Sequence, residues 1–311
     1  MAQLEKSQLH LGYIPLLDCV ALLWAKQRGF FEEVGLDVSL VKEESWASLR
    51  DRLAFGFLDA AHCLSAMLPA AALAQDQLGI PLQTPLVLSY NSAFISLSQK
   101  LCYALDIKKT DEAATTAQKF FSAMQHEQYL PIAHVFKQSI HHYCLREWLA
   151  LANTEFAKRV HLRTLPPPYM VEAISNQLID GFCVGEPWNT QAEIQGYSQI
   201  IATGSEIIPR VADKVLAVTQ EWAISNPNTL AALVQAIQKA QVELKQMQDL
   251  EPVWQVLVDY NIIRGFIPEQ AQPQVSDFVW LTQQMQKWDD VHLESDEIHS
   301  ISENCVIQTK T

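Results

Sequence analysis

The sequence predicts an α/β protein of two lobes separated by a cleft, and three observations support this prediction. Segments with the character of strands alternate with helical segments, which is typical of sheets whose strands are joined by crossover helices. Two extended crossings, near residues 91–94 and 184–186, would carry the chain from one lobe to the other and back. The chain has 311 residues, of which 49% are hydrophobic, so it can bury enough apolar surface for two domains.

The first part of the chain is predicted to alternate regularly between strand and helix. In order, we expect a strand at 9–14, a helix at 18–28, a strand at 38–41, a helix at 46–55, a strand at 58–61, a helix at 66–75, and extended segments at 85–90 and 94–97. Gly29 directly follows the first of these helices, in the position where a left-handed glycine commonly ends a helix. This order favours a parallel sheet.

The rest of the chain continues the alternation and then becomes helical. We expect a helix at 111–124, a strand at 130–136, a helix at 140–152, a strand at 160–165, a helix after three prolines at 166–168, strands at 182–184, 198–202 and 215–218, and helices at 230–247 and 253–262. The crossings would make lobe 1 discontinuous, with residues 1–93 and 184–311, and would leave residues 94–183 for lobe 2. The tail from Asp289 is acidic and is expected to fray at its end.

Charge and cysteine content exclude some partners and suggest a compartment. The net charge of −13, from 22 basic and 35 acidic residues, argues against direct binding of nucleic acid, which needs a basic face. The six cysteines stand among apolar neighbours without metal-ligand spacing, so we expect buried free thiols in a reducing compartment. They are Cys19, Cys63, Cys102, Cys144, Cys183 and Cys305.

The N-terminal sequence MAQLEKSQ has none of the apolar character of a signal peptide. No uninterrupted apolar run is long enough to span a bilayer, because the alanine-rich stretch near Ala70 is broken by polar residues. These features predict a cytoplasmic protein without a transmembrane segment, or a periplasmic one if a leader has been removed.

The most informative segment is the junction Asp180–Asn189, with the sequence DGFCVGEPWN. It is predicted to be a short buried strand that stops at Gly185 and turns into a helix, with Pro187 in the first helical turn. A glycine there lets the backbone approach a ligand closely. Taken alone, such a junction is usually only a turn in an α/β domain.

Two further helix starts have a similar character. Ser45 is a good N-cap before Trp46, whose indole N–H could donate to a ligand, although a role in the core is the simpler interpretation. Ser139 caps a helix with His141 in its first turn, where the helix dipole disfavours the cationic imidazole and a bound anion would favour it. A hydrogen-bonded or solvated histidine is the simpler interpretation. Three such helix starts that converged would form a site for a small anion.

The sequence contains few other residues or motifs that indicate ligand binding, catalysis or metal binding. His62 is expected at the carboxyl end of a strand, where ligand sites of α/β proteins lie, although a histidine satisfied beneath a loop fits equally well. The sequence has no nucleophile elbow, no phosphate-binding glycine loop and no HExxH motif. His141 and His142 are adjacent, so they cannot bind a metal from one helix face. We therefore expect a protein that is not an enzyme and needs no metal or cofactor.

Several segments together resemble the nitrate/bicarbonate-binding family of ABC-importer solute-binding proteins. The resemblance covers about residues 9–259 and is carried by LGYIPLLDC at 11–19, AKQRGFFEEVGLDV at 25–38, SWASLRDRLAFG at 45–56, LDAAH at 58–62, TPLVLSYN at 84–91, the helix at 141–150, LPPPYMVEAI at 165–174 and DGFCVGEPWN. It implies a type II periplasmic-binding-protein fold. Similar proteins are either exported for import or kept in the cytoplasm as nitrate/nitrite sensors that bind an RNA-binding antiterminator.

The resemblance also implies site residues. The ligand-contacting tryptophan of the family falls on Trp46, its histidine falls on His141, and its backbone contact falls near Gly185, Glu186 and Pro187.

Two departures from the family change its donor set. Asn91, Ser92 and Ala93 stand where many relatives carry an Asn-Gly followed by an amide side chain, and Pro209, beside Arg210, stands where they carry a lysine. Losing these donors removes hydrogen bonds worth about 1 and about 1.5–3 kcal/mol. Either Arg210 replaces the lysine or the pocket holds another ligand.

The resemblance and the N-terminal sequence lead to three functional hypotheses. The first is a cytoplasmic sensor that binds a small oxyanion, nitrate or nitrite, and signals through a protein partner of the antiterminator type. The second is the binding component of an ABC importer for nitrate, sulfonate or bicarbonate, which would contact a permease. The third is a biosynthetic enzyme on the same fold.

Overall fold

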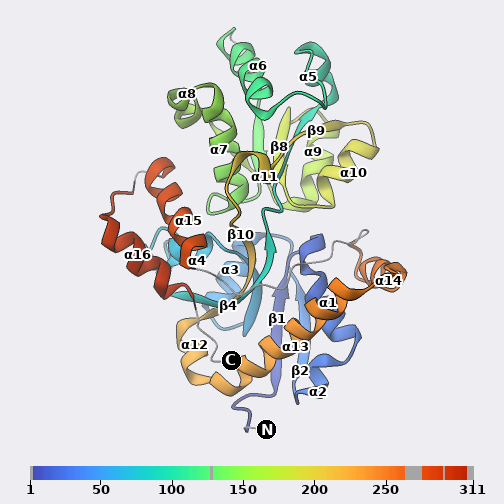
Figure 1. The fold of residues 1–311 in the computed structure, drawn as a ribbon, viewed down its shortest axis with the longest axis vertical. Helices are drawn as coiled ribbons and strands as arrows, with labels where there is room; N and C mark the ends of the chain where they lie inside the picture. The colour runs from blue at the N-terminus through green and yellow to red at the C-terminus, as the bar shows by residue number, and fades with distance from the viewer. Residues whose placement is uncertain (1–2, 127–128, 263–274, 290, 307–311) are drawn as a thin grey trace. The chain divides into compact units, whose positions relative to one another are not determined.

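The computed structural model describes residues 3–126, 129–262, 275–289 and 291–306. The chain forms two compact units, one of Met1–Tyr90 with Ala212–Thr311 and the other of Asn91–Val211. Each unit contains one five-stranded sheet with helices packed around it (Figure 1).

The sheet of the first unit is mixed. Its strands are β1 (Gln8–Tyr13), β2 (Asp37–Lys42), β3 (Ala60–Leu64), β4 (Leu82–Tyr90) and β10 (Ala212–Thr219). In the order β2-β1-β3-β10-β4, β1 is parallel to β2 and β3, whereas β10 is antiparallel to β3 and β4. The expected parallel sheet is therefore wrong at β10, because this strand returns from the second unit and enters the sheet in the opposite direction.

The helices of the first unit form two groups. They are η1 (Leu17–Cys19), α1 (Val20–Gln27), α2 (Phe30–Glu33), α3 (Trp46–Ala54), α4 (Met67–Ala72), α12 (Gln220–Ser225), α13 (Pro227–Gln246), α14 (Glu251–Asp259), α15 (Val275–Trp288) and α16 (Ser295–Asn304). Helix α1 packs against α2, α13 and α14, while α4 packs against α15 and α16 (Figure 1). Gly29 has φ +73° directly after α1, so the predicted left-handed helix stop is confirmed.

Strand β3 carries the central polar residue of this unit. All five of its residues are buried, and His62 is the only one with a polar ring among Ala60, Ala61, Cys63 and Leu64. Such a doubly covered strand normally reads as a continuous apolar run. His62 is thus placed in the middle of β3, opposite Leu216 of β10, and the expectation that it ends a strand is wrong.

The second unit has the same kind of mixed sheet. Its strands are β5 (Phe94–Ser98), β6 (Ile132–His134), β7 (Leu162–Thr164), β8 (Gly181–Val184) and β9 (Ser198–Thr203). In the order β7-β6-β8-β5-β9, β6 is parallel to β7 and β8, and β5 is antiparallel to β8 and β9.

The helices of the second unit are mostly short. They are α5 (Gln99–Ala104), α6 (Ala113–Gln125), α7 (Ile140–Ala152), α8 (Thr154–Arg159), η2 (Pro167–Tyr169), α9 (Met170–Ser175), α10 (Trp188–Ile194) and α11 (Gly204–Ile207). Helix α7, whose bounds match the predicted helix at 140–152, packs against α6, α8 and α11. Helices α5, α8 and α11 were not predicted from the sequence, and all three are short.

The return to the first unit comes later than the boundary expected after residue 183. Strand β9 pairs along its length with β5, with Phe94 opposite Thr203, so the segment that follows β8 belongs to the second unit. The chain instead returns between Val211 and Ala212. There the two connecting segments run side by side, because Asn91 N–H donates to the Val211 carbonyl at 3.2 Å. The composition of β9 is compatible with either sheet. Only its hydrogen-bonded pairing with β5 shows that it belongs to the second unit.

Candidate functional site

Trp46 is fixed at the start of α3 by a capped helix terminus. The Ser45 hydroxyl accepts a hydrogen bond from Ser48 N–H at 3.1 Å, which confirms Ser45 as the N-cap. Trp46 is only 1% exposed, so its ring belongs to the core, as the simpler interpretation held. Its indole Nε1, however, is buried without a hydrogen-bond partner in the described part of the chain. A buried N–H of this kind costs free energy until an acceptor reaches it.

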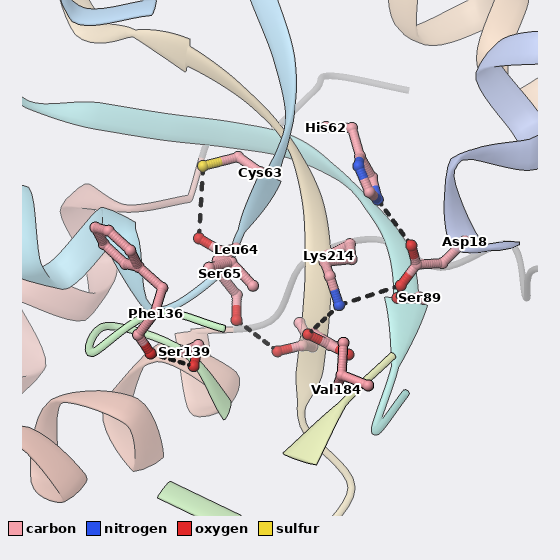
Figure 2. Close-up of polar contacts among 12 residues, drawn as sticks. Asp18, His62, Cys63, Leu64, Ser65, Ser89, Phe136, Ser139, Val184 and Lys214 are labelled. Carbon is pink, nitrogen blue, oxygen red and sulfur yellow. Dashed lines mark hydrogen bonds and ion pairs between the residues drawn. The ribbon is translucent and has the colours of Figure 1, made fainter. Parts of the chain in front are cut away.

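His62 lies beside Trp46 and is held by Asp18. The centroids of the Trp46 and His62 rings are 5.8 Å apart. His62 Nε2 is 2.9 Å from Asp18 Oδ1, as Figure 2 shows. Burial lowers the pKa of His62 below its usual value, although the Asp18 carboxylate opposes this effect. His62 is therefore a neutral imidazole at neutral pH.

Asp18 and Lys214 form a buried ionic centre with Asp213. Lys214 Nζ lies 3.2 Å from Asp18 Oδ2 and 2.7 Å from Asp213 Oδ1, and the Ser89 hydroxyl donates to Asp18 Oδ2 at 3.0 Å (Figure 2). The Lys214 ammonium also lies 5.9 Å from the centre of a Trp46 ring, so a positive charge lies next to the indole.

The charges of this centre hold each other ionised despite burial. Burial alone would raise the pKa of Asp18, but Lys214 and His62 hold it below its usual value. Burial alone would lower the pKa of Lys214, but Asp18 and Asp213 raise it. One ammonium against two carboxylates leaves the centre without net positive charge. Lys214 is therefore a buried cation whose charge is more than balanced by the two carboxylates beside it.

In the second unit, α7 is capped as predicted. Ser139 Oγ accepts from His142 N–H at 3.1 Å and donates to the Phe136 carbonyl at 2.6 Å. His141 occupies the first turn of α7 and is fully buried, so the interpretation of a solvated histidine is wrong. The imidazole is thus placed at the positive end of a capped helix.

His142, which also lies in the first turn of α7, forms a pair with His134. The ring of His142 is 4.8 Å from that of His134, whose Nδ1 is 2.7 Å from the Phe136 carbonyl and whose Nε2 is 3.1 Å from Thr164 Oγ1. Burial lowers the pKa of His134 to about 4 and that of His142 well below its usual value, with Arg146 adding to both shifts. Both rings are neutral at physiological pH.

Asn91 is committed to the protein backbone. Its Oδ1 accepts from Val211 N–H at 2.7 Å, and its Nδ2 donates to the Pro209 carbonyl at 3.0 Å. It therefore holds the segment that contains Arg210, which is exposed. The predicted ligand contacts of Asn91, Ser92 and Arg210 stay predictions, and for Asn91 the observed contacts are structural.

The junction after β8 differs in detail from the prediction. Helix α10 begins at Trp188, so Pro187 is its N-cap and does not lie in its first turn. Glu186 supplies the missing side-chain cap, because its carboxylate accepts from Thr190 N–H at 3.0 Å and from Thr190 Oγ1 at 2.8 Å. Burial raises the pKa of Glu186, and these hydrogen bonds oppose the shift. Gly185 is buried between the strand and the helix.

The structure thus gathers one predicted pair, Trp46 and His62, and adds four residues that were not predicted from the sequence. Those residues are Asp18, Ser89, Asp213 and Lys214. A signal for Lys214 was present, because the adjacent charges of Asp213 and Lys214 interrupt a strand that otherwise reads as buried. Convergence of Trp46, His62, His141 and Glu186 on one cleft involves both units and stays a prediction.

Two kinds of feature are absent from the residues that the structure describes. These residues contain no group of three or more His, Cys, Asp or Glu side chains placed to hold a metal ion. None of the helices within the described ranges is long and apolar enough to cross a membrane.

The fold defines the class: a two-unit α/β protein of the periplasmic-binding-protein type. The chain matches the nitrate-binding protein NrtA from Synechocystis PCC 6803 with a TM-score of 0.86 at 23% identity, over 98% of this chain and 87% of that one. It also matches the alkanesulfonate-binding protein SsuA from Xanthomonas axonopodis pv. citri with a TM-score of 0.73 at 14% identity, over 99% of this chain and all of that one. At these identities the matches establish the fold alone.

Sequence comparison identifies the family. The NMT1-like family model matches residues 2–258, and the chain belongs to this family. The bicarbonate transport ATP-binding protein CmpC of Synechocystis is 33% identical over 93% of this chain and 47% of its own length. The nitrate/nitrite binding protein NrtA of Nostoc is 32% identical over 87% of this chain and 62% of its own length. The chain thus spans about half to three fifths of these curated relatives.

Proposed function

We propose that this protein binds a small oxyanion of the nitrate or nitrite type and reports its presence to a protein partner. The observation that carries the proposal is the indole Nε1 of Trp46, buried without an acceptor next to the Lys214 ammonium. An anion oxygen at this position would satisfy the N–H, and a hydrogen bond to a charged group contributes about 1.5–3 kcal/mol. The relatives named for nitrate, nitrite and bicarbonate support the same ligand class.

The second unit contributes a predicted contact at His141. Its imidazole lies at the N-terminus of α7, where the helix dipole favours an anion. If the imidazole takes up a proton together with the ligand, affinity rises as the pH is lowered from about 8 to about 6. Arg210 is the exposed cation proposed to replace the family lysine.

Calorimetric titration with nitrate, nitrite and hydrogencarbonate tests the proposal. Trp46→Phe removes the N–H and keeps an aromatic ring, and it should weaken binding about tenfold or more. Trp24→Phe is the matched control, because Trp24 Nε1 is also buried without a partner in the described part of the chain. Trp24 belongs to the apolar core, so its replacement should leave affinity unchanged.

Variants at the other predicted contacts separate their roles. His141→Ala should weaken binding and flatten its pH dependence, whereas Arg210→Ala should weaken binding without changing the pH dependence. Failure of all three anions to bind at millimolar concentration would contradict the oxyanion proposal. The substitutions at Ala93 and Pro209 would then indicate a pocket for another ligand.

For the partner, the sensor hypothesis predicts an anion-dependent complex with an antiterminator-type regulator, visible by size-exclusion chromatography. The six free, buried cysteines agree with the reducing cytoplasm that this role requires. The alternative, a component of an ABC importer, is favoured by the transport roles in the names of CmpC and of the nitrate import ATP-binding protein NrtC of Synechocystis, which is 37% identical over 76% of this chain. It predicts instead a complex with a transporter permease or ATPase. The ATP binding in those names has no counterpart here, because this sequence lacks a GxxxxGK[ST] motif.

A further inference from the structure

Large apolar side chains are exposed around α12 in the first unit. Phe55 and Phe57, in the turn that follows α3, are 61% and 67% exposed, and Ile224 of α12 is 72% exposed. The other large apolar side chain that the described residues of this unit expose is Val258, on α14. A single exposed apolar residue is normal, whereas a group of them at one place commonly marks an interaction surface.

Two hollows adjoin α12 and share part of their lining. The first has a volume of about 350 Å³ and is bordered by Phe55 and other residues at the end of α3. The second has a volume of about 450 Å³ and is bordered by Ile224 and the turn at 79–81. Three residues line both hollows, namely Thr219, Glu221 and Ser225. The two hollows and the exposed side chains of Phe55, Phe57 and Ile224 therefore form one surface, which we call the α12 surface.

The α12 surface is held in place by contacts with the core. The Thr219 hydroxyl accepts from Trp222 N–H at 3.2 Å and so caps α12. The Trp222 indole donates to the buried carboxylate of Asp59 at 2.9 Å. Gln220 N–H donates to the Pro81 carbonyl at 2.9 Å, which joins α12 to the second hollow. A partner would therefore meet a preorganised surface and lose little free energy in ordering it.

The α12 surface is acidic as well as apolar. Glu221 is the only charged residue among those that line the two hollows. Its side chain is exposed, and its carboxylate has no ion pair or hydrogen bond with the described residues. The net charge of −13 adds a long-range attraction for cations. By charge complementarity, the surface fits a segment that carries apolar side chains together with a lysine or an arginine.

Two other occupants fit the surface less well. In a twofold dimer through this face, the surface would pair with its own copy and bring two Glu221 carboxylates together, which costs affinity. An anionic lipid bilayer could receive Phe55 and Phe57, but it repels the negative net charge of the chain. No basic residue among those that line the hollows offsets this repulsion.

We propose that the α12 surface is a docking site for an amphipathic segment of a partner protein, whose apolar side chains enter the two hollows and whose lysine or arginine pairs with Glu221. Proteins that receive such a helix in a groove recognise apolar residues at spacings of three and four. The inference goes beyond the proposed function, since it concerns the first unit alone and does not require that an oxyanion binds.

A library of short random peptides displayed on phage provides the probe. We expect peptides selected against the wild-type protein to combine apolar residues at helical spacing with a lysine or an arginine. Fluorescence anisotropy of one selected peptide then measures its affinity. Phe55→Ser and Ile224→Ser should each weaken binding about tenfold or more. Val258→Ser is the matched control, because it removes an exposed apolar side chain from another helix of the same unit, and it should leave the affinity unchanged.

Reversal of the charge tests the ionic contact. Glu221→Lys should weaken binding of the selected peptide about tenfold or more, and selection against this variant should yield acidic peptides. Glu251→Lys is the matched control, because Glu251 is likewise exposed in the first turn of its helix, and it should have little effect. All these side chains are exposed, so the substitutions leave the core intact.

Several results would overturn the inference. They are a selection that yields no peptide, and selected peptides whose binding is unchanged by Phe55→Ser, Ile224→Ser and Glu221→Lys. A wild-type dimer that Phe55→Ser dissociates, seen by size-exclusion chromatography, would assign the surface to a second copy of the chain. Co-sedimentation with phosphatidylglycerol vesicles that Phe55→Ser abolishes would assign it to a membrane. None of these results bears on the calorimetric test of anion binding, so the two proposals fail separately.

Discussion

Lys214 Nζ lies 2.7 Å from Oδ1 of Asp213, its neighbour in the chain, and both side chains are 0% exposed. Consecutive residues of a strand normally point to opposite faces of the sheet. Here the pairing of β10 with β4 shifts register on both sides of Lys214. The irregular register accompanies a charged contact between two adjacent residues, and this contact forms part of the ionic centre under Trp46.

Removing the cation of this centre should be strongly destabilising. Lys214→Met leaves the carboxylates of Asp18 and Asp213 buried without their ammonium, and losing one partner of a buried ion pair costs about 3–5 kcal/mol. Urea denaturation at neutral pH measures the change in the free energy of unfolding. The double variant Asp213→Asn/Lys214→Met should lose less stability than the single variant, since it also removes one of the two carboxylate charges that face the ammonium.

The matched control is Lys158→Met, which breaks the exposed pair of Lys158 with Glu155. It should change the stability by less than about 1 kcal/mol. If Lys214→Met reduced the free energy of unfolding as little as Lys158→Met, Asp18 and Asp213 would not be held ionised by the lysine.

The histidine pair of the second unit should make α7 sensitive to acid. The folded pKa values of His134 and His142 are lowered, so between the usual histidine pKa of about 6.5 and the folded values the unfolded chain binds more protons. The stability that these two neutral histidines contribute is therefore fully present above about pH 6.5 and is lost as the pH is lowered towards about 4. With its folded pKa at about 4, His134 alone accounts for a loss of about 3 kcal/mol.

Hydrogen exchange of the α7 amides, monitored by mass spectrometry between about pH 7 and about pH 5 after correction for the intrinsic exchange rate, measures this effect. His142→Phe should reduce the pH dependence of protection, and His126→Gln, at an exposed position of the same unit, should not. Protection that is independent of pH in the wild-type protein would contradict the prediction.

The cap of α7 should contribute measurably to stability. Ser139→Ala removes an acceptor for His142 N–H and a donor to the Phe136 carbonyl, and loss of a serine cap typically costs about 1 kcal/mol. Chemical denaturation followed by circular dichroism gives the difference. Ser122→Ala, inside α6, is the control and should be nearly neutral, because Ser122 is exposed and its hydroxyl donates to the Gln118 carbonyl of the preceding turn. Equal effects of the two substitutions would argue against the cap.

The thiols should be unreactive in the folded protein. All six cysteines are free and buried, and burial raises the pKa of Cys102 to about 11 and that of Cys63 to about 12, so little thiolate is present at neutral pH. Titration with a disulfide reagent should detect almost no fast-reacting thiol in buffer and six in denaturant without reductant. Fewer than six in denaturant, in protein from its native host, would indicate disulfides and an oxidising compartment.

The sequence by itself determined the local elements and the family. Helix α7 was predicted with its observed bounds, because a good serine cap and a strong apolar periodicity both mark it. The caps at Ser45 and Ser139 and the stop at Gly29 were likewise predictable, since each depends on a few neighbouring residues. The segments at 45–56 and 180–189 were specific enough to indicate the family that the comparisons confirmed.

Tertiary structure alone decided the pairing of the strands and the composition of the polar centre. Strand β9 joins the second unit through hydrogen bonds to β5, and β10 inserts antiparallel between β3 and β4, neither of which leaves a periodic signal in the sequence. Asp18, Ser89 and Lys214 come from three distant segments, and burial and partner charges together set their ionisation. Local sequence specifies backbone conformation, whereas a buried electrostatic site exists only when the folded chain removes water from around it.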